Sequence, residues 1–88
     1  MLKIDLSKHA GDFLMDLPAK QYKQIVTTVL CLIKNLRPHD SSKLQGFDDM
    51  YRVDIGEYRI IYSFDDSIVY IKLIGKRNGG EVYKKLKR

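Results

Sequence analysis

The strongest constraint on this chain is the alternation of apolar and charged residues from position 51 to position 62, YRVDIGEYRIIY. Two short runs flank Gly56-Glu57, and glycine first in a two-residue loop is typical of a type II′ hairpin turn. This turn pairs Asp54 with Arg59 and gathers the large apolar residues on one face. That face comprises Tyr51, Val53, Ile55, Tyr58, Ile60 and Tyr62. A slip of one residue would turn the whole set towards water, so the pattern predicts a single register.

A third alternating run, residues 67–74, predicts another strand beside the hairpin. If Asp65-Asp66 forms a second two-residue turn, Arg59 pairs with Lys72. The apolar face then gains Val69, Ile71 and Leu73. The opposite face is expected to stay open to solvent, with Arg52, Asp54, Arg59, Ile61, Ile68, Tyr70, Lys72 and Ile74 on it.

Helical periodicity replaces alternation in the N-terminal half. Residues 2–6 predict a first strand, and Ser7 is the expected N-cap of a helix running to about Leu17. A longer helix is expected from Pro18 to Leu36, because its apolar residues recur at helical spacing. Its apolar stripe is Tyr22, Ile25, Val26, Val29, Leu32, Ile33 and Leu36.

Turn-forming residues fill positions 37–46 and predict a loop, whereas residues 81–88 could form a short final helix. The expected element order is β-α-α-β-β-β-α within one domain, residues 1–88. We therefore expect an α+β fold in which two N-terminal helices pack on one face of a small antiparallel sheet.

The composition of the chain indicates which cellular compartment it suits and whether it is expected to bind a cofactor or a metal. The chain has no apolar run of membrane-spanning length and no recognisable signal peptide. Its one cysteine, Cys31, cannot form an internal disulfide and is expected near the surface, with no base at helical spacing to make it a nucleophile. No metal-ligand spacing of Cys and His is present. These features favour a cytoplasmic protein without a cofactor, a metal or a membrane partner.

Positive charge is concentrated near the C-terminus. Residues 72–88 hold seven of the 16 Lys and Arg residues but one of the 11 Asp and Glu residues. A local basic patch of this kind suits a polyanion such as nucleic acid, although a solubilising charged tail would have the same composition. The nucleic-acid interpretation is favoured because Arg52 and Arg59 are expected on the same side.

Four motifs in this order resemble the RelE/ParE superfamily of toxins from type II toxin–antitoxin systems. They are LSKHAGDFLMDLP, RPHDSSKLQGFDDMYRV, GEYRIIYSFDD and IGKRNGGEVY, and together the resemblance covers nearly the whole chain. The chain looks closer to the RelE branch, whose members cleave messenger RNA on the ribosome. The ParE branch, which poisons DNA gyrase, usually lacks the Arg and Tyr of the last motif.

This resemblance implies a metal-independent endoribonuclease, in which the ribose 2′-hydroxyl attacks the neighbouring phosphate and gives a 2′,3′-cyclic phosphate. Such a reaction needs a proton acceptor, cations for the charge that grows on the phosphate, and a donor for the leaving 5′-oxygen. Arg59 corresponds to the family's phosphate-stabilising arginine on the hairpin. Arg77 corresponds to the arginine that also helps the leaving group, and Tyr83 to the tyrosine that stacks on or orients the base.

Two positions depart from the pattern, because RelE-type toxins have lysines where this chain has Arg52 and Asp54. Arg52 can hold a phosphate but is a poor general base, since guanidinium stays protonated. Asp54 could accept the proton, or it could form a cross-strand ion pair with Arg59. Lysines are the other candidate bases: Lys43, Lys72 and Lys76. Predicted RNA contacts are Lys43, Lys72, Lys76 and Lys84.

The predicted function is a toxin that cleaves messenger RNA on the ribosome. Two alternatives stay open: a ParE-like gyrase inhibitor, and a catalytically weak homologue that binds RNA. The family also implies a RelB-like antitoxin as partner, with an acidic and apolar segment that folds over the basic face.

Overall fold

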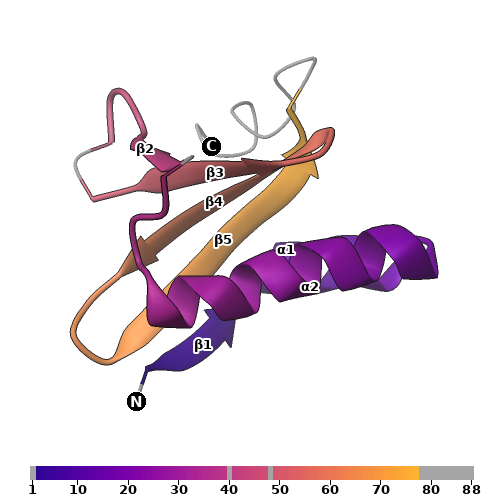
Figure 1. The fold of residues 1–88 in the computed structure, drawn as a ribbon, viewed down its shortest axis with the longest axis horizontal. Helices are drawn as coiled ribbons and strands as arrows, with labels where there is room; N and C mark the ends of the chain where they lie inside the picture. Colours follow the sequence, from indigo (N-terminus) through magenta and orange to yellow (C-terminus); the bar gives the residue numbers. More distant parts are fainter. Residues whose placement is uncertain (1, 40, 48, 78–88) are drawn as a thin grey trace.

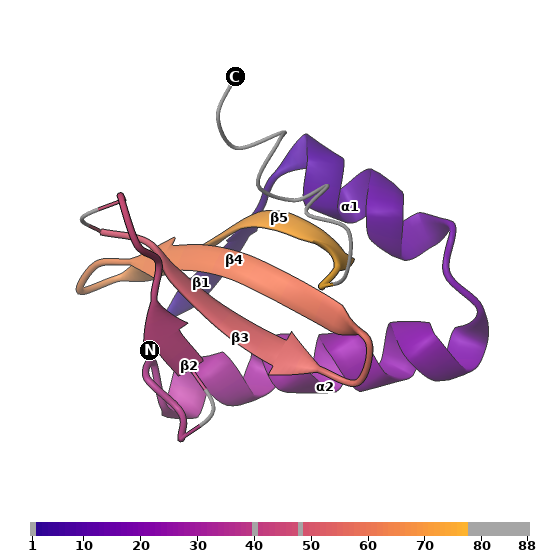
Figure 2. The same ribbon diagram turned by 90° about the horizontal axis from the view of Figure 1, so that it is seen from above.

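The computed structural model describes residues 2–39, 41–47 and 49–77. They form a five-stranded sheet with two helices along one of its faces (Figures 1 and 2). In chain order the elements are β1 Lys3–Leu6, α1 Lys8–Met15, α2 Ala19–Lys34, β2 Ser41–Lys43, β3 Tyr51–Ile55, β4 Tyr58–Phe64 and β5 Ile68–Lys76. The predicted α+β class is confirmed, and the predicted final helix lies outside the described residues.

The strand order is β1-β5-β4-β3-β2, and two features of this sheet differ from the prediction. β1 pairs with β5 in parallel, so the sheet is mixed rather than antiparallel throughout. A parallel pair needs a long crossover connection, and α1 and α2 lie within it. β2 pairs with β3. The sequence did not predict this strand, because its three residues lie inside a run of turn-forming residues.

The hairpin register is as predicted. Asp54 pairs with Arg59 and Val53 with Ile60 across β3 and β4. Gly56 has a φ of 58°, a left-handed conformation that glycine adopts without steric cost. The turn therefore sets which side chains of the two strands face the helices.

The β4–β5 connection is longer than the predicted two-residue turn. The Asp65 carboxylate accepts hydrogen bonds from the backbone N–H groups of Ser67 and Ile68, at 2.8 and 2.9 Å. This side-chain-to-backbone turn moves the first strand pair to Phe64–Val69. The register is shifted by two residues, which leaves the faces of the first half of β5 unchanged.

A β-bulge then changes the faces of the second half of β5. Tyr62 pairs with Ile71 but Ile61 pairs with Leu73, so Lys72 is the extra residue. Beyond it Leu73 turns away from the helices and Ile74 turns towards them, the reverse of the prediction. Arg59 consequently lies opposite Gly75 instead of Lys72.

The main core lies between the helices and the sheet. Ser7 caps α1 as predicted: its hydroxyl accepts from the Ala10 N–H (3.1 Å) and donates to the Lys72 carbonyl (2.6 Å). Pro18 is the N-cap of α2 instead of a residue of its first turn. The predicted helix stripes supply the core, although Tyr22 is exposed. Its buried members are Ala10, Leu14, Ile25, Val29, Leu32, Val53, Tyr58, Ile60, Tyr62, Val69, Ile71 and Ile74.

The opposite face of the sheet is not fully open, contrary to the prediction. Ile61 and Leu73 are buried there beneath Leu44, with Phe47 and Met50 packed against them. The segment that covers them is closed by a 2.8 Å hydrogen bond from the Leu44 N–H to the Met50 carbonyl. A second, smaller core therefore occupies the middle of this face.

This second core predicts a large stability loss for Ile61→Ala. Ile61 is 0% exposed, so truncation would leave a cavity and cost about 2–5 kcal/mol in the free energy of unfolding. Urea unfolding followed by circular dichroism measures the change. Leu30→Ala is the control, because Leu30 is 53% exposed and its replacement should change stability by about 0.5 kcal/mol or less. Equal small losses for both variants would contradict the packing described here.

Candidate nucleic-acid interface

Three arginine side chains meet around one carboxylate on the face of the sheet away from the helices. Arg52 and Asp54 are two residues apart on β3, so their side chains lie on the same face of the sheet. Arg59 lies directly across from Asp54 on β4. Arg77 follows the last residue of β5. We call Arg52, Arg59 and Arg77 the arginine cluster, with Asp54 as its central anion.

The three arginines lie at different distances from the Asp54 carboxylate, with Arg59 closest and Arg77 farthest. Arg59 makes a two-pronged contact, with Nε 2.7 Å from Asp54 Oδ1 and Nη2 3.2 Å from Oδ2. Nη1 of Arg52 lies 3.4 Å from Oδ2, and Nη1 of Arg77 lies 3.8 Å from the same oxygen. Both carboxylate oxygens are therefore engaged by guanidinium groups.

Arg77 reaches this cluster because the end of β5 is tied to the β3–β4 turn. Its backbone N–H donates to the Glu57 carbonyl at 3.0 Å. The turn and the C-terminal end of β5 lie side by side at the same end of the sheet (Figure 1). Arg59 and Arg77, which are 18 positions apart in the sequence, thus contact the same carboxylate.

The cluster keeps Asp54 ionised. The hydrogen bond from Arg59 lowers the pKa of Asp54, partial burial opposes this, and the charges of Arg59, Arg52 and Arg77 lower the pKa further. Asp54 is thus the cross-strand ion-pair partner of Arg59, one of the two roles the sequence left open. A carboxylate held in this way is a weak proton acceptor.

A hollow of about 340 Å³ opens beside the cluster. Its lining combines two of the arginines with residues from β2 and the segment after it: Lys43, Leu44, Gln45, Arg52 and Arg59. We call it the arginine-lined hollow. Cationic and amide groups around a small cavity suit a phosphate or another anion.

The other predicted site residues are placed differently. Lys72, at the bulge, has Nζ 5.2 Å from the ring centroid of Tyr70, near the far end of the sheet. Lys76 pairs with Tyr58, and strand alternation puts it on the helix side. Lys43 lines the same hollow as Arg52 and Arg59, although its strand partner Tyr51 faces the helices. Lys72 and Lys76 do not line that hollow. Tyr83 and Lys84 lie outside the described residues.

Two residues that line the arginine-lined hollow, Leu44 and Gln45, were not predicted from the sequence. Leu44 and Gln45 belong to a segment expected to be an undifferentiated loop, and the pairing of β2 with β3 brings them to Arg52. A signal was available in Gly46, whose φ of 86° closes the turn from Leu44 to Phe47.

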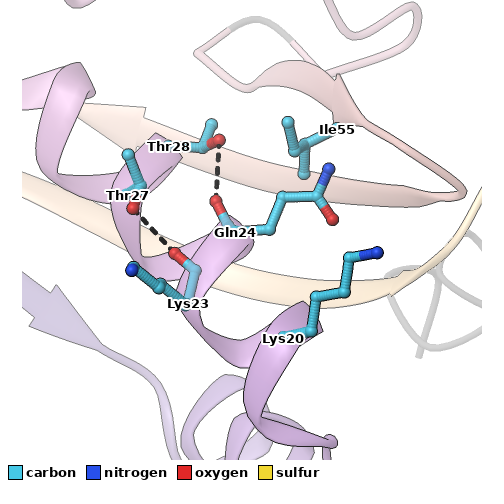
Figure 3. Close-up of a pocket in the computed structure, with 6 residues that line it drawn as sticks. All are labelled: Lys20, Lys23, Gln24, Thr27, Thr28 and Ile55. Atoms are coloured by element: carbon cyan, nitrogen blue, oxygen red, sulfur yellow. Dashed lines mark hydrogen bonds between the residues drawn. The ribbon is translucent and has the colours of Figure 1, made fainter.

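A second hollow of about 400 Å³ lies beside α2, on the helix side of the sheet (Figure 3). Its lining is Lys20, Lys23, Gln24, Thr27, Thr28 and Ile55. Both threonine hydroxyls donate to α2 carbonyls, to Lys23 at 2.7 Å and to Gln24 at 3.2 Å. Its charge comes from two exposed lysines, so it is the weaker candidate for binding a phosphate.

None of the helices in residues 2–39, 41–47 and 49–77 is long and apolar enough to cross a bilayer. Cys31 is exposed, as predicted.

Comparison with known proteins now assigns the family. The family model described as the ParE toxin of the type II toxin–antitoxin system, parDE, matches residues 4–79. The protein called "Putative toxin RelE1" in Methanocaldococcus jannaschii is 32% identical over 81 residues, which cover 86% of this chain and 90% of that one. The chain belongs to the RelE/ParE superfamily of type II toxins.

Solved structures of RelE proteins share the fold of this superfamily member. A RelE–RelB complex from Pyrococcus horikoshii OT3 contains a chain with 27% identity and a TM-score of 0.77, over 89% of this chain and 97% of that one. A mutant E. coli RelE in the free state matches with a TM-score of 0.81 and 24% identity, over 99% of this chain and 96% of that one. The mixed sheet with two helices of this chain therefore matches the fold of these RelE structures.

The lowered pKa of Asp54 predicts how this toxin loses stability in acid. Because the folded pKa lies below the unfolded value of 3.8, the ion pairs stabilise the fold fully above that pH. Their contribution is lost as the pH falls through the folded pKa. Asp54→Asn should therefore be less stable at pH 7, by about 1 kcal/mol, and should lose less on acidification.

Urea unfolding at a series of pH values between neutrality and the onset of acid unfolding measures this difference. Asp66→Asn is the control, since Asp66 lies exposed in the turn between β4 and β5. Parallel curves for Asp54→Asn and the wild type would show that the ion pairs add nothing to folding.

Proposed function

We propose that this toxin is a ribosome-dependent endoribonuclease that cleaves messenger RNA without a metal ion. The supporting observation is the convergence of Arg52, Arg59 and Arg77 beside a hollow also lined by Lys43. Guanidinium groups make paired hydrogen bonds to phosphate oxygens, and three of them can spread over a phosphate that gains charge.

In the proposed reaction the 2′-oxygen attacks phosphorus and loses its proton, while the bond from phosphorus to the 5′-oxygen breaks. The 5′-oxygen takes up one proton as the 2′-hydroxyl loses one, so the products, a 2′,3′-cyclic phosphate and a 5′-hydroxyl, balance the reactant in atoms and charge. Arg59 and Arg52 would stabilise the charge on the phosphate. Arg77, whose side chain is the most exposed of the three, would donate a hydrogen bond to the leaving 5′-oxygen. Tyr83 is proposed to stack on or orient the base.

The proton acceptor in this proposal is Lys43. Asp54 is held by arginines through both oxygens, and of the three candidate lysines Lys43 is the one that lines the hollow. Lys72, Lys76 and Lys84 are proposed to contact RNA outside the reacting phosphate.

A RelB-like antitoxin is the proposed protein partner. The Pyrococcus horikoshii relative was solved as a RelE–RelB complex. An acidic and apolar segment would suit the surface described here, because the arginine cluster adjoins the apolar residues Leu44, Phe47 and Met50.

Cleavage on assembled ribosomes tests the enzymatic proposal. A message positioned in the decoding site should be cut by the wild type, and both Arg59→Ala and Arg77→Ala should reduce the rate about 10²–10³-fold. Arg37→Ala is the matched control, since Arg37 lies over the ring of Tyr51, on the helix side of the sheet. Primer extension maps the cut. Intact message at stoichiometric protein, or an equal loss in Arg37→Ala, would count against the proposal.

Gyrase inhibition is the second candidate function, favoured by the match to a ParE family model. A supercoiling assay separates the two. Inhibition of DNA gyrase by a protein that leaves ribosome-bound message intact would select the ParE-like role. Binding of RNA with neither activity would select the catalytically weak homologue.

A further inference from the structure

Asp54 carries the negative charge at the centre of a cationic site. Its carboxylate contacts all three members of the arginine cluster, and its side chain is 24% exposed. A carboxylate with a two-pronged contact to one guanidinium and single contacts to two others presents them with the same kind of acceptor as a phosphate. The position opposite Arg59 is thus already filled by an anion that the chain itself supplies.

We infer that Asp54 is a positioning residue that acts as a built-in counter-ion: it holds the three guanidinium groups together and weakens their attraction for any other anion. An incoming phosphate must share the arginines with the carboxylate or draw them away from it. The inference deepens the proposed function, on which its relevance to RNA rests, but binding alone can test it.

The geometry explains how the Asp54 side chain can both hold the guanidinium groups together and leave them able to bind another anion. Three guanidinium groups repel one another, and the carboxylate between them offsets that repulsion. The short Asp54 side chain is attached to β3 one residue before that strand ends, whereas the arginines are long and can turn outward. Arg77 can do so most readily, because its side chain is 48% exposed and lies farthest from the carboxylate, at 3.8 Å.

The charge balance sets the expected size of the effect. The cluster and Lys43 bring four positive charges, and Asp54 cancels one of them. Neutralising Asp54 should make one more cation available to a bound strand. For a single strand, each cation engaged changes the slope of log affinity against log salt by about 0.7.

The experiment measures binding of a fluorescein-labelled, single-stranded DNA dodecamer by fluorescence anisotropy at salt concentrations from roughly 50 to 400 mM. DNA lacks the 2′-hydroxyl, so it cannot be cleaved by the proposed reaction. Asp54→Asn should bind about five- to tenfold more tightly than the wild type near 0.1 M salt. Its salt dependence should be steeper by about 0.7.

Two controls distinguish an effect of the charge at position 54 from an effect of the net charge of the protein. Asp54→Glu keeps the charge and should retain the wild-type slope. Asp66→Asn removes one negative charge from the exposed β4–β5 turn and should change affinity less than about twofold. Asp54→Ser is a second neutral variant for the case in which Asp54→Asn does not fold, and circular dichroism checks each protein.

Binding by Asp54→Asn that equals or falls below that of the wild type would overturn the inference, as would an equal gain in Asp66→Asn. Failure of both neutral variants to fold would also overturn it, because Asp54 would then have a structural role alone. Tighter DNA binding by Asp54→Asn, together with intact message in the ribosome assay, would uphold the counter-ion and reject the endoribonuclease.

Discussion

The pairing of Asp54 with Arg59 across the β3–β4 hairpin is the interaction on which the rest of the surface depends. Strand alternation ties it to the core: if Val53 and Ile60 face the helices, Asp54 and Arg59 must face the other way. The hydrophobic effect thus fixes the position of a charged pair that contributes little to burial itself. Arg52, on β3, and Arg77, directly after the end of β5, also contact Asp54.

The bulge at Lys72 links the two cores. It lets β5 place Ile71 and Ile74 under the helices while Leu73 packs on the other face with Ile61. It also leaves Gly75 opposite Arg59, so no side chain from β5 stands across from this guanidinium. One extra residue therefore sets both the packing of the small second core and the residue of β5 that pairs with Arg59.

Sequence patterns predicted the parts of this toxin that depend on local periodicity. The hairpin register, the Ser7 cap and the buried stripe of α2 follow from spacing and from one glycine turn. Convergence of Arg59 and Arg77 followed from the family resemblance. The parallel pairing of β1, the bulge and the short β2 did not, because each depends on contacts between distant segments that leave no periodic trace. The burial of Ile61 was missed for the same reason.

The same long-range pairing has a consequence for biosynthesis. β5 lies between β1 and β4, and β1 joins the sheet through β5, its parallel neighbour. The hydrogen bond from Ser7 to Lys72 closes a loop of 65 residues, an entropic cost that must be met before the contact stabilises the chain. A nascent chain that lacks β5 therefore lacks both Arg77 and the strand that joins β1 to β4. Any function that depends on Arg77 would have to wait until β5 and Arg77 have left the ribosome that makes the chain.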